Sequence, residues 1–222
     1  MGMIETPAMH NWNVTICGEV GSEIIVTTNQ TEIYAHRGSV DQRWQYTKRS
    51  SCGIPVIGCE THLVVAFDGK IQLYRVNGED SSSTELLSLC SSIEVEEGES
   101  DADGFINESV AWGPGNSHFI VGYPHQISVW KLDATTDSVS LTKTITVVEF
   151  EVKNVALAED YIVVSSENKK VHVWNRGTGE KMAYHTTFFR GNTLCDIGLV
   201  GDDELTEDDL FTPFRFPVMD QS

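Results

Sequence analysis

Apolar and polar residues alternate in short runs along the chain, and one version of this pattern recurs four times. In each recurrence an apolar residue stands directly before an aromatic one. The aromatic residues lie roughly 40 to 56 residues apart, a spacing typical of internal repeats, and they are Tyr34, Tyr74, Trp130 and Trp174. Alternation with a period of two predicts β-strands, because successive side chains of a strand point to opposite faces. The pattern therefore predicts a repetitive all-β protein.

Each aromatic strand is predicted to be the third of four strands in a unit. A β-rich run precedes it, and a few turn-forming residues such as Asp68 and Gly69 separate the two, which predicts a hairpin. A further candidate strand lies before each hairpin and another after it. The predicted strands span residues 13–18, 23–28, 32–37, 42–47, 54–59, 62–67, 71–76, 85–90, 109–114, 118–123, 127–132, 138–147, 152–157, 161–166, 171–176 and 180–185.

Four-stranded units of this kind predict a β-propeller. One such sheet cannot cover both of its apolar faces, so the units must stack on one another. We predict about four blades and the start of a fifth at 192–200. The propeller is assigned to 1–200, with an acidic insertion at 92–108, and an acidic and aromatic tail occupies 201–222. A β-sandwich with coincidentally spaced strands is the alternative fold.

The last unit resembles a WD repeat. Its sequence SSENKKVHVWNRGTGE, residues 165–180, has small residues leading in, a polar turn residue at Asn168, the run V-x-V-W and the exit T-G-E. Asn175 stands where the name-giving Asp of the family would be, and the chain has no Gly-His dipeptide. The resemblance is weaker over the other three units. It implies a degenerate WD40-like propeller whose blades, without the family's His, Asp and Ser/Thr network, are held mainly by apolar packing.

A propeller must also close, and the sequence leaves three ways open. Residues 3–8 could supply a closing strand for a small ring, the chain could be a fragment or splice form of a longer propeller, or a partner could complete it. An uncovered sheet edge is a hazard that proteins normally avoid. Of the three, a partial propeller is the prediction we favour.

The charge of the chain limits its partners. Lys and Arg total 15 against 33 Asp and Glu, which gives a net charge of −18. Such a surface repels phosphate backbones and anionic membranes, so direct nucleic-acid binding is disfavoured and protein partners with basic surfaces are expected. No apolar run is long enough for membrane insertion, and five sparse cysteines indicate reduced thiols. We expect a cytoplasmic or nuclear location.

Two acidic segments are candidate binding sites. In the insertion, Glu99, Asp101 and Asp103 precede Gly104 as in a calcium loop, but Val110 replaces the bidentate carboxylate, which favours a solvated loop without metal. The tail combines acids with exposed-type aromatics, a composition suited to a segment that orders on a partner; packing on the last blade is equally compatible. The possible partner-binding residues are Asp208, Asp209, Leu210, Phe211, Phe214 and Phe216.

No motif for a nucleophile, a phosphate loop or a zinc site is present, so we predict a protein that is not an enzyme and needs no cofactor. The predicted function is a non-catalytic interaction scaffold or adaptor subunit of a larger complex. The family resemblance implies, as one possible role, a substrate-recruiting adaptor of a ubiquitin ligase. The alternatives are a propeller glycosidase that uses dispersed carboxylates, or a spacer whose tail is the binding element. The sequence marks no two acids for glycoside chemistry, because Asp68 and Asp196 are better explained as turn or strand-end residues.

Overall fold

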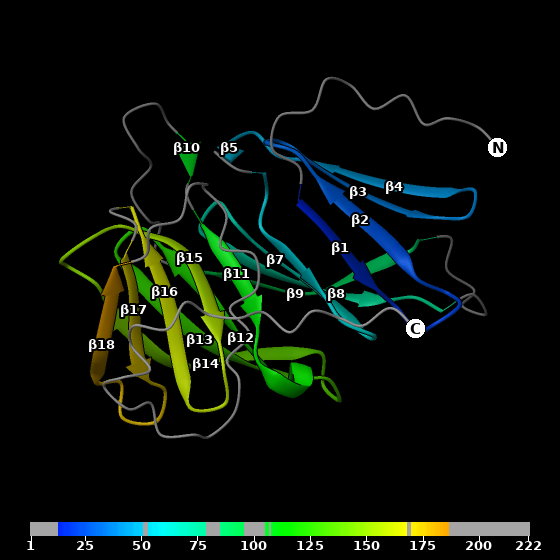
Figure 1. The fold of residues 1–222 in the computed structure, drawn as a ribbon. Coiled ribbons are helices and arrows are strands. Elements are labelled where there is room, and N and C mark those ends of the chain that lie inside the picture. The colour runs from blue at the N-terminus through cyan, green and yellow to red at the C-terminus, as the bar shows by residue number, and fades with distance from the viewer. Residues whose placement is uncertain are drawn as a thin grey trace, which may run out of the picture.

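The computed structural model describes residues 13–50, 53–78, 85–95, 105–106, 108–167 and 170–186. Over these residues the chain forms four antiparallel four-stranded sheets, with one short 3₁₀ turn at Pro114–Asn116. Within each sheet the strands follow one another in chain order. The sheets stack side by side (Figure 1). This architecture confirms the predicted all-β fold of partial propeller blades.

We call the sheets blades 1 to 4. Each predicted strand overlaps one of the observed strands. Blade 1 consists of β1 (Asn13–Cys17), β2 (Ile24–Thr28), β3 (Glu32–Arg37) and β4 (Val40–Gln45). Blade 2 consists of β6 (Val56–Gly58), β7 (His62–Phe67), β8 (Lys70–Val76) and β9 (Leu87–Glu94). Blade 3 consists of β11 (Ser109–Trp112), β12 (His118–Tyr123), β13 (Gln126–Asp133) and β14 (Ser138–Thr146). Blade 4 consists of β15 (Val152–Leu157), β16 (Tyr161–Ser166), β17 (Lys170–Asn175) and β18 (Lys181–Thr186).

One small element was not predicted. The two-residue strands β5 (Arg49–Ser50) and β10 (Phe105–Ile106) pair in parallel. This contact ties the connection between blades 1 and 2 to the end of the acidic insertion. Strand β9 also continues to Glu94, into the segment that the sequence assigned to the insertion.

The hairpin turns follow from local chemistry. At the β7–β8 turn, Asp68 and Gly69 have φ angles of 58° and 65°. Two consecutive residues with positive φ are the requirement of a two-residue turn whose twist matches that of the strands, and Asp-Gly is a preferred pair there. The turn sets the register that pairs Phe67 with Lys70.

A bulge marks the same place in three of the blades. The pairing of the third and fourth strands shifts between Leu73 and Tyr74, and equivalent shifts occur directly before Trp130 and Trp174. The corresponding pairing in blade 1 runs past Tyr34 without a shift. A bulge increases the local twist of the strand and changes the direction of a side chain. In these three blades the backbone conformation therefore recurs at this position together with the aromatic residue.

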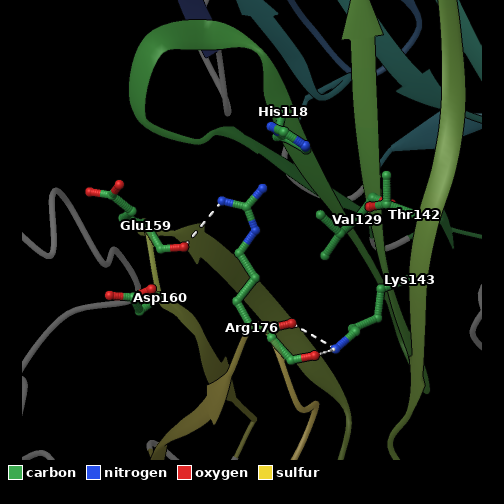
Figure 2. Close-up of a pocket in the computed structure, with 8 residues that line it drawn as sticks. His118, Val129, Thr142, Lys143, Glu159, Asp160 and Arg176 are labelled. Carbon is green, nitrogen blue, oxygen red and sulfur yellow. Dashed lines mark hydrogen bonds between the residues drawn. The ribbon is translucent and has the colours of Figure 1, made fainter.

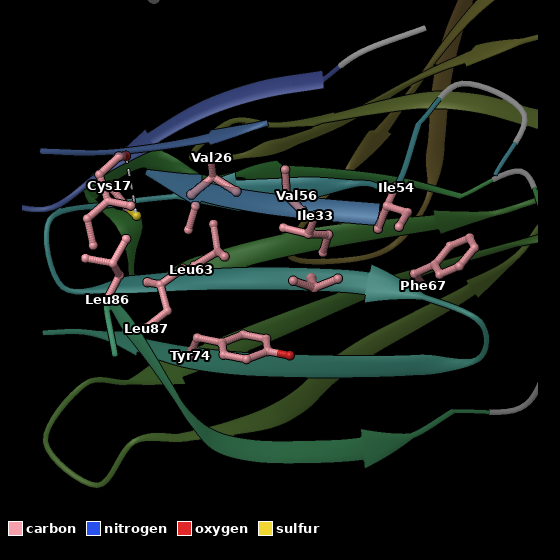
Figure 3. Close-up of a cluster of buried hydrophobic side chains, with 13 residues drawn as sticks. Cys17, Val26, Ile33, Ile54, Val56, Leu63, Phe67, Tyr74, Leu86 and Leu87 are labelled. Carbon is pink, nitrogen blue, oxygen red and sulfur yellow. Dashed lines mark hydrogen bonds between the residues drawn. The ribbon is translucent and has the colours of Figure 1, made fainter. Parts of the chain in front are cut away.

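Three apolar clusters join the blades, and each is made by one face of a blade and the opposite face of the next. Figure 3 shows the cluster between blades 1 and 2, where Cys17 and Val26 meet Leu63 and Tyr74. Phe119 belongs to the cluster between blades 2 and 3, and Ile162 belongs to that between blades 3 and 4. In blades 2, 3 and 4 the clusters bury the second strands almost completely, which explains why those runs are apolar on both faces.

The first strands β1, β6, β11 and β15 line one edge of the stack and contact one another in chain order. They approach so closely that glycine is needed. A Cβ atom on Gly58 would lie 2.6 Å from the backbone oxygen of Ile16 in blade 1. The second strand of blade 3 also comes close to the first strand of blade 4, since a Cβ atom on Gly122 of β12 would lie 2.6 Å from Cγ1 of Val155 on β15.

Several sequence predictions lie outside the described residues. These are the closing strand at 3–8, the fifth-blade strand at 192–200, the tail at 201–222, and Glu99, Asp101, Asp103 and Gly104 of the loop that resembles a calcium site. Among the residues that the structure does describe, no helix is long and apolar enough to cross a membrane.

Candidate functional site

The signature aromatic residues all belong to the same face of their blades. In blades 2, 3 and 4 this face packs against the preceding blade, and Tyr74, Trp130 and Trp174 are each 5% exposed. Tyr34 occupies the same position in blade 1. It is only half-buried, because no blade among the described residues lies in front of blade 1.

We call this uncovered side of blade 1 the end face. Strand register puts Ile16 opposite Ile25, Val14 opposite Thr27, and Thr27 opposite Tyr34, so all five side chains share it. Val14, Ile16 and Ile25 are 64%, 58% and 46% exposed. In Figure 1 blade 1, drawn in blue, stands at one end of the stack and blade 4 at the other. The end face is therefore an apolar sheet surface open to solvent.

Charged and polar groups border the apolar centre of the end face. The guanidinium carbon of Arg43 lies 5.2 Å from the ring centroid of Tyr34, and Arg43 also forms an ion pair with Glu32. The Tyr34 hydroxyl donates a hydrogen bond to Glu32. Beside them, Nδ1 of His36 lies 2.5 Å from Oδ1 of Asp41. These contacts lie within blade 1 and hold its outer strands in place around the apolar patch.

A second candidate is a pocket of about 300 Å³ in the seam between blades 3 and 4 (Figure 2). Nζ of Lys143, on β14, donates to the backbone oxygens of Arg176 and Gly177 at 2.7 and 2.6 Å. The Arg176 guanidinium donates to the backbone oxygen of Glu159 at 3.2 Å. The cations that line the pocket are thus bound to carbonyl groups, and they fasten the β17–β18 turn to blade 3. We assign this pocket to blade packing.

A third site combines two carboxyl groups at the seam between blades 2 and 3. Burial raises the pKa of Glu108 to about 7; the nearby Asp68 carboxylate adds to this, while the backbone N–H groups of Gly69 and Asp68 oppose it. Asp68 forms an ion pair with Lys48 at 2.5 Å and sits in the β7–β8 turn at positive φ. The sequence predicts that Asp68 and Asp196 are turn or strand-end residues rather than the acids of a glycosidase. Asp68 is a turn residue beside Glu108, and Asp196 lies outside the described residues.

The seam between blades 2 and 3 also holds a polar network that the sequence did not predict. Nε2 of His62 lies 3.1 Å from Oδ1 of Asp137, and Nε of Arg75 donates to the same oxygen at 3.2 Å. The indole N–H of Trp112 donates to the backbone oxygen of Gly58 at 2.9 Å. Blade contacts are therefore not only apolar. No sequence signal marks this pairing, because His62 and Asp137 are 75 positions apart.

The remaining predicted residues can be placed briefly. The tail residues Asp208, Asp209, Leu210, Phe211, Phe214 and Phe216 lie outside the described residues. His172 is 4% exposed and stacks on Phe150 with ring centroids 3.8 Å apart. Within the described ranges, His, Cys, Asp and Glu form no group of three that could hold a metal ion.

Comparison with known proteins identifies the fold. No family model matches the chain, and no curated protein matches it in sequence. The structure is similar to that of Sqt1 from Saccharomyces cerevisiae, a WD40 protein, with a TM-score of 0.54 and 14% sequence identity. The match covers 78% of this chain and 46% of Sqt1, so the chain spans less than half of that protein's length. Together with the four-stranded sheets, this likeness supports a WD40-like propeller fold, and a fold of this kind hosts many functions.

Proposed function

We propose that the chain is a non-catalytic protein-interaction scaffold, and that its partner docks on the end face of blade 1. The partner presents the apolar face of another four-stranded antiparallel sheet, as a further propeller blade would. The exposure of Val14, Ile16 and Ile25 on one sheet face is the observation that carries this proposal.

Continuity with the interior of the molecule supports the choice of a β-sheet as the occupant. Within the described ranges the same kind of interface occurs three times, always with the aromatic face of one blade against the opposite face of its neighbour. Tyr34 is the one signature aromatic whose face lacks such a neighbour among the described residues. The match covers 46% of Sqt1, so a protein of similar fold continues beyond the part that corresponds to these blades.

The composition of the end face also suits a protein interface. Exposed apolar side chains gathered on one face mark interaction sites in soluble proteins, and interfaces characteristically have an apolar centre with a polar rim. Val14, Ile16 and Ile25 supply the centre, and Glu32 and Arg43 supply part of the rim. An apolar centre makes affinity depend mainly on shape and burial rather than on charge.

Net charge bears on which partners meet this surface. A chain with net charge −18 attracts partners with basic surfaces and speeds their encounter. We place the protein in the cytoplasm or nucleus. Recruitment of substrates to a ubiquitin ligase would be one form of such scaffolding, and it rests on the resemblance of fold alone.

The test compares two substitutions of the same type. Ile16→Glu puts a charge at the centre of the end face, whereas Val148→Glu puts it at a position that is 84% exposed in the connection between blades 3 and 4. Partners captured by the wild-type chain are purified, and their affinity for each variant is measured by calorimetry. A photo-crosslinking residue at position 14 identifies the peptide that contacts the end face.

The expected result is at least about a tenfold loss of affinity for Ile16→Glu, equivalent to about 1.4 kcal/mol, with Val148→Glu unchanged. The crosslinked peptide should come from a β-strand of the partner. Equal binding by both variants would mean that the partner does not dock on the end face. A crosslink to a second copy of the chain, or within the chain itself, would mean that the proposed occupant is wrong. Turnover of a glycoside by the purified chain, lost on Asp68→Asn, would overturn the non-catalytic assignment.

A further inference from the structure

Cys59 stands beside the polar network between blades 2 and 3. It lies in the connection from β6 to β7, and its backbone is held on two sides. Its N–H donates to the oxygen of His62 at 2.8 Å, and its own oxygen accepts from the N–H of Gly18 at 3.1 Å. The thiol is partly accessible, because the residue is half-buried.

The side chains of this connection form a continuous chain of polar contacts. Sγ of Cys59 lies 3.9 Å from Oγ1 of Thr61, and Oγ1 of Thr61 lies 2.9 Å from Nδ1 of His62. On the other side of the ring, Nε2 of His62 lies 3.1 Å from Oδ1 of Asp137. His62 is 1% exposed, so its ring is fixed between these partners.

Asp137 sets the protonation pattern of the imidazole. The Arg75 guanidinium holds the pKa of Asp137 below its usual value, so this carboxylate is ionised and accepts a hydrogen bond from the Nε2–H group of His62. Nδ1 of His62 is then the ring nitrogen that exchanges a proton with the Cys59 thiol. A nucleophile, a base and a group that orients the base are the three parts of an activated nucleophile.

The three cysteines that the structure describes differ in the pKa of their thiols. The hydrogen bond with Cys59 raises the pKa of His62, with Asp137 adding to it against the effect of burial. Burial acts to raise the pKa of Cys59, but hydrogen bonds from His62 and Thr61 outweigh it and leave that pKa below its usual value. Burial raises the pKa of Cys17 to about 12. Partial burial and the carboxylate of Asp137 raise the pKa of Cys90.

We propose that Cys59 is a modification site, activated by the His62–Asp137 pair, that reacts with small uncharged hydroperoxides. The thiolate attacks one oxygen of the peroxide, so an S–O bond forms while the O–O bond breaks. The departing hydroxide, or the alkoxide of an alkyl hydroperoxide, takes a proton from the His62 imidazolium and leaves as water or an alcohol. Cys59 is thereby oxidised by two electrons to a sulfenic acid, and the peroxide is reduced. A net charge of −18 and the adjacent Asp137 carboxylate disfavour anionic oxidants.

The first experiment uses the three described cysteines as internal references. The native full-length chain is treated briefly with limiting iodoacetamide, and labelling of each cysteine is quantified by mass spectrometry of its peptide. Hydrogen peroxide with a sulfenic-acid trap is used in a parallel sample. Cys59 should react at least about threefold faster than Cys90, although Cys90 is the more exposed thiol, and Cys17 should stay unlabelled.

The second experiment tests Asp137 as a positioning residue, with Asp137→Asn. Asp137 has a φ angle of 50°, a conformation that Asn tolerates, so the turn itself is not strained by the change. Labelling of Cys59 should slow several-fold, whereas labelling of Cys90 should hold steady or quicken because a carboxylate beside it is gone. Asp133→Asn is the matched control. It removes an exposed aspartate of the same turn, which accepts hydrogen bonds from Thr135, and it should leave Cys59 unchanged.

The pH dependence of alkylation gives an independent measure. The groups that interact with Cys59 are Cys17 of blade 1, His62 and Thr61 of its own connection, and Asp137 through His62. In Asp137→Asn the midpoint of the Cys59 rate profile should move to higher pH. The proposal fails if Cys59 reacts no faster than Cys90 in the wild type, or if the variant leaves rate and midpoint unchanged. Faster labelling of every cysteine, Cys17 included, would indicate a loosened fold and would also overturn it.

Discussion

Replacing Glu108 with Gln is expected to change how the stability of the protein depends on pH. The carboxyl group of Glu108 lies at the seam between blades 2 and 3, and its Oε2 atom is buried without a hydrogen-bond partner among the described residues. Burial favours the neutral form of the acid, and the negative charge of Asp68 favours it further. Gln has the shape of protonated Glu but cannot ionise.

The size of the effect follows from the change in pKa on folding. The pKa of Glu108 rises from 4.5 to about 7 in the folded protein, and one pKa unit corresponds to about 1.4 kcal/mol. Below pH 4.5 both states are protonated and the group does not affect stability. Between pH 4.5 and 7 the unfolded chain releases its proton while the folded chain keeps it, so stability falls as pH rises. Above pH 7 the ionised carboxylate costs the folded state about 3 kcal/mol.

The assay is urea unfolding of the wild-type chain and of Glu108→Gln at intervals from pH 4.5 to 8, with m-values compared to verify the same transition. The free energy of unfolding of the variant, relative to wild type, should increase by about 3 kcal/mol across this range. Glu180→Gln is the control. It removes one negative charge from an exposed position in the β17–β18 turn, so it corrects for the change in net charge.

Parallel stability curves for the wild type and Glu108→Gln would refute this reasoning. They would mean that Glu108 is ionised in the folded state and that solvent reaches its carboxyl group. A variant that gains stability equally at every pH would also contradict the prediction, because a gain of that kind comes from packing rather than from ionisation.

Two further substitutions test the packing between blades. Gly58→Ala should destabilise the protein by about 1 to 3 kcal/mol in urea unfolding, because the added methyl group meets the backbone of Ile16. Gly78→Ala, where no atom lies within 4 Å of the added Cβ, should be neutral or slightly stabilising, and a comparable loss there would remove the steric explanation. Phe119→Ala should lower the melting temperature strongly, with a cost of about 3 to 5 kcal/mol, because the side chain is 0% exposed. Leu141→Ala, at a position that is 52% exposed, should cost far less, and similar losses for both would contradict the assignment of Phe119 to the core.

Local patterns predicted most of the fold. The strands β7 and β8 follow from their apolar runs, and the Asp68-Gly69 pair between them specifies the turn. These signals act over a few residues, because side-chain alternation and turn geometry depend only on nearby backbone angles. The short strands β5 and β10 lacked such a signal. Two-residue strands carry no periodicity, and their pairing depends on how the connections cross in space.

The candidate sites were less predictable. The sequence identified Tyr34 as equivalent to Trp130, but it did not reveal that one of them is half-buried and the other 5% exposed. That difference in exposure depends on whether another blade covers the face to which the aromatic residue belongs. Nothing in the sequence likewise links His62 to Asp137, since the contact between them spans 75 positions.

By itself, the sequence determined the units of this protein: four-stranded sheets with an aromatic residue at a repeated place, in an acidic chain. Those features are set by local periodicity, turn residues and composition. The tertiary structure alone decided which faces are covered, which polar groups meet in the seams, and that the aromatic face of blade 1 stays exposed. The physical reason is that burial and hydrogen bonding between blades depend on the distances created when separate sheets stack, and no short segment of sequence contains those distances.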